Sequence, residues 1–174
     1  MSTLSEENAA LDEFFSQHYN TLRQLAHRRL RRSGKITLLD TTALVHESYL
    51  RFQKAGRVNL PGRVQFVSFA AHVMRSIVVD FVRRRRAERR GGDGQCVTLD
   101  PEIAAARSPE DEIIRVHEAL DELSKVDARL VKVVEMRYFG GLEELEIAGA
   151  LGVTGRTVRR DWEKARVLLS LALH

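Results

Sequence analysis

Two short helical patterns separated by a break at Gly152 occupy residues 142–166, and they limit the folds open to this chain more than any other stretch. Apolar residues recur through the first pattern, and a glycine just after the last of them is a typical helix stop. Thr154 is placed to cap the second helix, in which a period of about 100° per residue puts Val158 and Trp162 on one face and basic residues on the other. The pattern predicts a helix-turn-helix, whose second helix typically enters the major groove of duplex DNA.

The polar and basic side chains near the start of that second helix are the candidates for contact with duplex DNA. Arginine can donate two hydrogen bonds to a guanine edge, and a threonine hydroxyl can bond to a phosphate or a base. The candidates are Thr154, Arg156, Thr157, Arg159, Arg160 and Lys164. The alternative is an ordinary pair of helices whose basic face is only solvated, so the rest of the chain has to decide.

The composition indicates a globular protein built from helices. Hydrophobic residues make up 44% and charged residues 30% of the chain, which excludes a disordered tail. With only 11 Gly and 3 Pro and few alternating runs, the sequence predicts an all-α fold. The polar N-terminus has no signal-peptide pattern, and charged residues interrupt the apolar stretch 66–82, so we expect a cytoplasmic protein without a membrane span.

Helical periodicity and charge divide the chain into two expected domains. Helices are predicted over 4–32, 41–52 and 66–90, and then from Ser108-Pro109 and from about 125 to 139. Residues 96–107 lack periodicity and read as a linker between a domain over 1–95 and a second over 108–174. Residues 1–95 hold 17 Lys and Arg against 9 Asp and Glu, whereas the remainder holds 11 against 15. A basic domain is therefore joined to a mildly acidic one that carries a basic helix.

The region 56–90 has the composition of a surface that binds single-stranded nucleic acid. Its loop is polar and basic, and the helix after it ends in six Arg among residues 83–90, a density that favours phosphate contact. The candidates are Asn59, Arg63, Gln65, Phe69, His72, Arg75, Ser76, Arg83 and Arg84. Surface loops often have this composition without binding anything. At the end of the first predicted helix, the basic run 28–32 is equally compatible with a solvated face and with phosphate contact.

Enzymatic function finds no support in the sequence. The 6 His lack the paired spacing of metal ligands, and neither a phosphate-binding glycine motif nor a nucleophile elbow is present. Cys96 stands alone and cannot form an internal disulfide. We therefore expect no catalysis, no metal and no cofactor.

Three motifs in a fixed order carry a family resemblance. The chain reads D-x-x-x-L-V-x-E-x-Y-L from Asp40, F-x-x-F-A-x-x-V-x-R-S-I-x-V-D-F-V-R-R-R-R from Phe66, and R-Y-F-G-G-L-x-x-x-E-I-A-x-x-L-G-V-T-x-R-T-V-R-R from Arg137. Together they resemble the extracytoplasmic-function (ECF) class of bacterial sigma factors over nearly the whole chain. The rival interpretations are a stand-alone helix-turn-helix regulator and a protein-only adaptor.

The resemblance implies a promoter-specificity subunit of RNA polymerase. Residues 1–95 would correspond to sigma region 2, which captures the minus-ten element as a single strand, and 108–174 to region 4, which reads the minus-thirty-five element as a duplex. The partners implied are promoter DNA and the beta-prime coiled coil and beta flap of core polymerase. The polymerase-binding candidates are Asp40, Thr41, Thr42, Leu44, Val45, Glu47 and Tyr49.

Two departures from the family pattern lead to further expectations. Where the family usually reads D-A-E-D-L-V-Q-E, residues 40–47 read D-T-T-A-L-V-H-E, so hydroxyls replace carboxylates. Since a phosphate supplies about −1.5 to −2 charges, we hypothesise that a Ser/Thr kinase activates the protein at Thr42, with Thr41 as the alternative site. The competing interpretation is that Thr42 caps the helix. Asp161 stands where the family often has a basic residue, which suggests an unusual promoter sequence.

Overall fold

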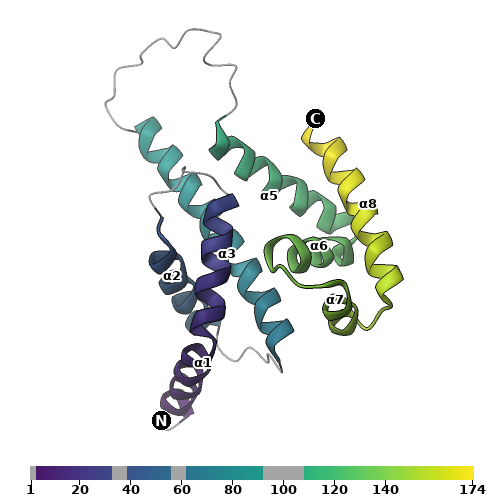
Figure 1. Cartoon of the computed structure of the whole chain (residues 1–174). Coiled ribbons are helices and arrows are strands. Elements are labelled where there is room, and N and C mark those ends of the chain that lie inside the picture. The colour runs from purple at the N-terminus through teal and green to yellow at the C-terminus, as the bar shows by residue number, and fades with distance from the viewer. Residues whose placement is uncertain (1–2, 33–38, 56–61, 92–107) are drawn as a thin grey trace.

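The computed structural model describes residues 3–32, 39–55, 62–91 and 108–174, and every element in those ranges is a helix. This confirms the all-α fold class. Figure 1 shows α1, α2 and α3 gathered at the left and α5 to α8 at the right. The expected linker, with Cys96, lies outside the described residues, as does Asn59.

The N-terminal half is a bundle of α1 (Thr3–Arg32), α2 (Thr41–Ala55) and α3 (Arg63–Gly91). Apolar residues at helical spacing give each helix an inward stripe, and Leu22, Leu44 and Phe66 are fully buried where the stripes meet. Phe52 lies between Phe66 and Phe69, with ring centroids 6.1 Å and 5.1 Å away. α3 begins before the expected start at Phe66, so Arg63 and Gln65 belong to its first turn and not to a loop.

The C-terminal half comprises α5 (Pro109–Val126), α6 (Ala128–Val134), the π-helical turn η2 (Glu135–Phe139), α7 (Glu144–Leu151) and α8 (Gly155–Leu173). α5 starts where Ser108-Pro109 predicted it, because Ser108 and Asp111 form a reciprocal capping box. Asp127 ends α5 and caps α6 by accepting a hydrogen bond from the Arg129 amide at 3.1 Å. The single helix expected from about 125 to 139 therefore begins only after the break at Asp127, and its last five residues form the wider π-helical turn η2.

The two halves share one core through α3. Buried residues from Leu22 to Ala165 form one contiguous apolar cluster, and α3 packs against η2, α5 and α7 as well as against α1 and α2. Residues 63–89 have the length and hydropathy of a membrane-spanning helix, but 56% of their most apolar window is buried, as in the core helix of a globular protein. The side of α3 that carries the single-strand candidate Arg75 is therefore packed against the C-terminal helices.

Candidate nucleic-acid and polymerase interfaces

The turn between α7 and α8 sets the direction of the basic helix. Gly152 ends α7 in the left-handed region with φ 64°, which an L side chain adopts only with strain. The Thr154 hydroxyl then accepts a hydrogen bond from the Thr157 amide at 3.3 Å and caps α8, as expected. Val158 and Ala165 are buried, so the opposite side of α8 faces outward. Arg156, Arg159, Arg160 and Lys164 are all exposed there.

Two glycine-to-alanine substitutions, one at Gly152 and one inside α7, test the left-handed turn. Gly152→Ala is expected to lower the free energy of unfolding by about 1 kcal/mol, because alanine strains a left-handed backbone although nothing lies within 4 Å of the added carbon. Gly149→Ala, inside α7 and equally unobstructed, should raise it by about 0.5–1 kcal/mol because alanine favours the helix. Urea titration followed by circular dichroism measures both. Changes of the same sign would contradict the assigned turn.

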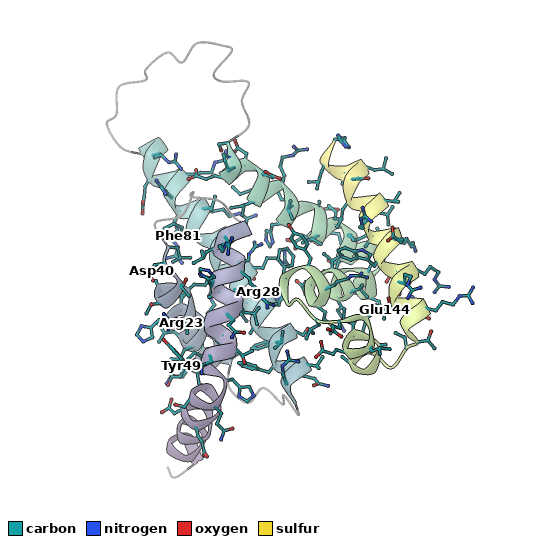
Figure 2. The ribbon with its side chains drawn as sticks, viewed as in Figure 1. Arg23, Arg28, Asp40, Tyr49, Phe81 and Glu144 are labelled. Carbon is teal, nitrogen blue, oxygen red and sulfur yellow. The ribbon has the colours of Figure 1, made fainter. Side chains whose placement is uncertain are left out.

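Glu144, at the start of α7, holds one of the outward arginines. Its two carboxylate oxygens accept hydrogen bonds from Nε and Nη2 of Arg159 at 3.2 Å and 3.1 Å. Figure 2 labels Glu144 beside the lower part of α8. A β-carbon at Gly155 would lie 2.8 Å from the same carboxylate, so a larger residue there would require the Glu144 side chain to shift. The pair orients the guanidinium before any ligand arrives.

Asp161 is a packing residue, contrary to its expected role in promoter choice. It is only 2% exposed, and its carboxylate accepts a hydrogen bond from Arg129 Nε at 2.7 Å. The Arg160 guanidinium lies 3.7 Å from the other carboxylate oxygen. The acid therefore joins α8 to α6 and does not belong to the outward face that carries Arg156.

The predicted single-strand residues on α3 follow one stripe, and the C-terminal half covers much of it. Arg75 is 4% exposed and contacts Glu135 of η2 through Nε at 3.1 Å and Nη2 at 3.0 Å, so it is not a surface residue. His72 Nδ1 lies 2.9 Å from the same carboxylate. Phe69 and Ser76 are half-buried, whereas Gln65, Arg83 and Arg84 are exposed.

Glu135 and His117 both lie beside Arg75, and the pKa of each is lowered. Burial alone would raise the pKa of Glu135, but the hydrogen bond and charge of His72 and the charge of Arg75 outweigh it and lower the pKa below 4.5. Burial and the Arg75 charge lower the pKa of His117 below 6.5. At neutral pH the carboxylate is therefore ionised and the imidazole is uncharged.

Asp40 caps α2, which settles a question that the sequence left open. Its carboxylate accepts a hydrogen bond from the Ala43 amide at 2.7 Å, and its carbonyl accepts one from the Leu44 amide at 3.0 Å. Thr41 is half-buried and Thr42 is exposed in the first turn. The competing interpretation, in which Thr42 caps the helix, is therefore wrong, because Asp40 caps it.

The comparison with known protein families now identifies the chain. A family model described as ECF sigma factor matches residues 3–174. The chain belongs to the ECF sigma factor family. This confirms the resemblance carried by the three sequence motifs. No curated protein and no solved structure was found to match this ECF sigma factor.

The α2 surface of this ECF sigma factor differs from the expected set of polymerase-binding residues. Leu44 and Val45 lie in the core, so they support the helix from within and cannot touch a partner. Glu47 pairs with Arg51 at 3.6 Å, and the Tyr49 hydroxyl donates to Asp12, which raises the pKa of that tyrosine. The exposed residues that the sequence analysis missed are Ala43, His46 and Leu50, whose spacing of three and four was the available signal.

In the described part of this ECF sigma factor, no three His, Cys, Asp or Glu side chains gather as they would around a metal ion. Members of the family direct transcription initiation. The surfaces of α2, α3 and α8 offer charged groups and hydrogen-bonding groups to a partner.

Proposed function

We propose that this sigma factor reads the minus-thirty-five element with α8, captures the minus-ten single strand with α3 and the segment before it, and docks on core RNA polymerase with α2. The observation that carries the proposal is the outward face of α8, where Arg156, Arg159, Arg160 and Lys164 are all exposed opposite buried Val158. A helix with its cations on one face and its apolar residues on the other fits a major groove.

The outward residues of α8 divide into two roles. Arg156 follows the cap closely, and the N-terminal residues of a recognition helix are those nearest the base edges. Arg159, held by Glu144, is suited to a fixed contact, whereas Lys164 lies 3.9 Å from Asp127 near the edge of the face and suits phosphate. The exposed apolar residues Val167 and Leu171, farther along α8, are candidates for the beta flap.

The N-terminal and C-terminal halves act as two units in this proposal, over residues 1–95 and 108–174. Single-strand capture needs cations for the backbone and an aromatic face for the bases. α3 offers Arg83 and Arg84 exposed near its end, Gln65 exposed near its start, and a half-buried Phe69 between them. Arg75, at the centre of the same stripe, becomes available only when the two halves separate.

Permanganate footprinting of open complexes tests the assignment of the minus-ten surface. Alanine at Asn59, Arg63 and Gln65 together is expected to reduce thymine reactivity at the melted element about tenfold or more, since each lost contact to a base or phosphate costs about 1 kcal/mol or more. Duplex binding by α8 should persist. Unchanged reactivity in the triple variant would exclude this surface as the site of capture.

The hydroxyls of α2 fit a charge switch for polymerase binding. No acidic residue occupies the first turn of α2, and Thr42 is exposed there while Asp40 holds the cap. A phosphate on Thr42 would be stabilised by the positive end of the helix dipole and would offer three acceptor oxygens to basic residues of a partner. We propose a Ser/Thr kinase as the activating partner, with half-buried Thr41 the less accessible site.

The affinity for core polymerase distinguishes binding that requires a phosphate on Thr42 from binding that needs none. Thr42→Glu is expected to tighten binding of the unmodified protein about threefold to tenfold, whereas Thr42→Ser stays weak until it is treated with a kinase. Gln24→Glu is the matched control, because it adds the same charge at an exposed position of α1, outside the proposed docking helix. Tight binding by the unphosphorylated wild type would remove the reason for a switch.

A further inference from the structure

Carboxylates of the C-terminal helices line the basic side of α3 from its first turn to its last. Glu146 of α7 lies 2.5 Å from Arg63, Glu135 of η2 lies 3.0 Å from Arg75, and Asp111 of α5 lies 2.9 Å from Arg86. Glu110 of α5 contacts Arg89 and lies 4.0 Å from Arg85. Each of these acids occupies a position where a phosphate would otherwise meet the same guanidinium.

The central pair is closed off from solvent and fully bonded. Arg75 has no acceptor atom, so the His117 Nδ1 that it contacts must be the acceptor and Nε2 must carry the ring hydrogen. That Nε2 lies 3.4 Å from Asp121, so the neutral ring links the guanidinium to a second acid. With Glu135 on its other side and only 4% of the residue exposed, Arg75 is out of reach of a nucleic acid while the halves are packed together.

The duplex-reading face is arranged differently. Arg156, Arg159 and Arg160 of α8 remain exposed while Arg75, at the centre of the α3 surface, is buried. Glu144 bonds Arg159 from the side, and the Arg159 side chain is still 70% exposed. The packing of the two halves therefore buries the centre of one nucleic-acid surface, pairs the arginines toward its ends with carboxylates, and leaves the α8 face open.

We propose that the acidic C-terminal helices autoinhibit this sigma factor by imitating the phosphate backbone on α3, so that free protein cannot take up single-stranded DNA until the halves separate. This inference rests on the proposed role of α3 in single-strand capture. One guanidinium cannot hold a carboxylate and a phosphate in the same place, so the two compete. If only about one molecule in ten is open, the apparent affinity for single strands falls about tenfold.

The test removes the masking charges without touching the proposed DNA surface. Glu110→Gln, Glu135→Gln and Glu146→Gln are combined in the full chain, since glutamine keeps the shape of each side chain. The control combines Glu112→Gln, Glu118→Gln and Glu122→Gln, which are exposed on α5 and remove the same total charge. Anisotropy of a labelled single-stranded oligonucleotide should show at least about tenfold tighter binding by the masking variant than by the control. Duplex affinity should change equally in both.

A distance measurement reports the opening itself. Spin labels at exposed Ser16 of α1 and Ser170 of α8, with Cys96→Ser, should give a narrow distribution in the wild type and a longer, broader one in the masking variant. If the triple variant does not fold, Glu110→Gln with Glu146→Gln should give an intermediate gain in single-strand affinity. A masking variant that binds single strands no tighter than the control would overturn the proposal, whether or not the halves separate.

Failure of autoinhibition and failure of the proposed function give different results. If only autoinhibition fails, wild type and masking variant both support promoter opening with core polymerase, and their single-strand affinities match that of the control. If the role of α3 fails, substitutions at Arg63 and Gln65 leave melting unchanged in every background.

Discussion

Alanine at Arg156, Arg159 and Arg160 together is expected to weaken binding to a minus-thirty-five duplex by about 100-fold or more. The three side chains are exposed on the outward face of α8, and each arginine contact to a base or phosphate contributes about 1–3 kcal/mol. Arg156→Ala alone should relax the sequence preference if that residue reads a base. A phosphate contact would instead weaken all sequences alike and lower the salt slope by about one.

The matched control removes three positive charges elsewhere. Lys54→Ala, Lys125→Ala and Lys132→Ala change exposed residues on α2, α5 and α6, away from the outward face of α8. Electrophoretic mobility shifts at several salt concentrations compare the two triple variants. If both lose affinity equally, binding depends on net charge, and the assignment of α8 as a reading helix fails.

Asp161→Arg is expected to destabilise the native state by at least about 3 kcal/mol, although it restores the charge that the family often carries there. The carboxylate is 2% exposed and accepts from Arg129 at 2.7 Å, so a guanidinium in its place would meet two other cations in a buried position. Thermal and urea unfolding measure the loss. Any fall in promoter binding should follow the loss of folded protein.

Glu163→Arg is the control for Asp161→Arg. It makes the same change of charge two residues farther along α8, but Glu163 is exposed and pairs only at the surface, 3.4 Å from Arg166. Surface pairs contribute little, so its effect on unfolding should stay within about 0.5 kcal/mol. A stable Asp161→Arg protein with altered promoter preference would return Asp161 to the DNA-reading surface.

The helices and the outward face of α8 could be predicted because their signals are local. Ser108-Pro109, Gly152 and Thr154 fix helix ends through bonds to neighbouring residues, and the spacing of Val158 and Trp162 orients α8. Periodicity along one helix says which residues share a face. That information was enough to identify the face of α8 that points away from the apolar core.

The covering of α3 could not be predicted because its causes lie far away in sequence. The stripe of His72, Arg75 and Ser76 reads as a solvated face when only its own helix is considered. Its partners Glu135 and His117 are supplied by η2 and α5, and Asp161 likewise finds Arg129 on α6. A buried charge looks like an exposed one in a sequence until the residue that neutralises it is known.

The sequence also left open which residue caps α2. Asp40, Thr41 and Thr42 are three consecutive residues of types that favour helix starts, so composition leaves the register open by a residue or two. The hydrogen bond from the Ala43 amide selects Asp40. That choice removes the capping role from Thr42, and phosphorylation at Thr42 stays a prediction.

Transcription by purified core RNA polymerase tests the central claim most directly. Templates randomised at the two promoter elements are transcribed with wild type, Thr42→Glu and the triple arginine variant of α8, and the RNA starts are sequenced. We predict starts downstream of one enriched pair of elements with wild type or Thr42→Glu, and none with the triple arginine variant. Duplex binding without any promoter-specific start in either of the first two proteins would contradict a sigma factor and favour a stand-alone regulator.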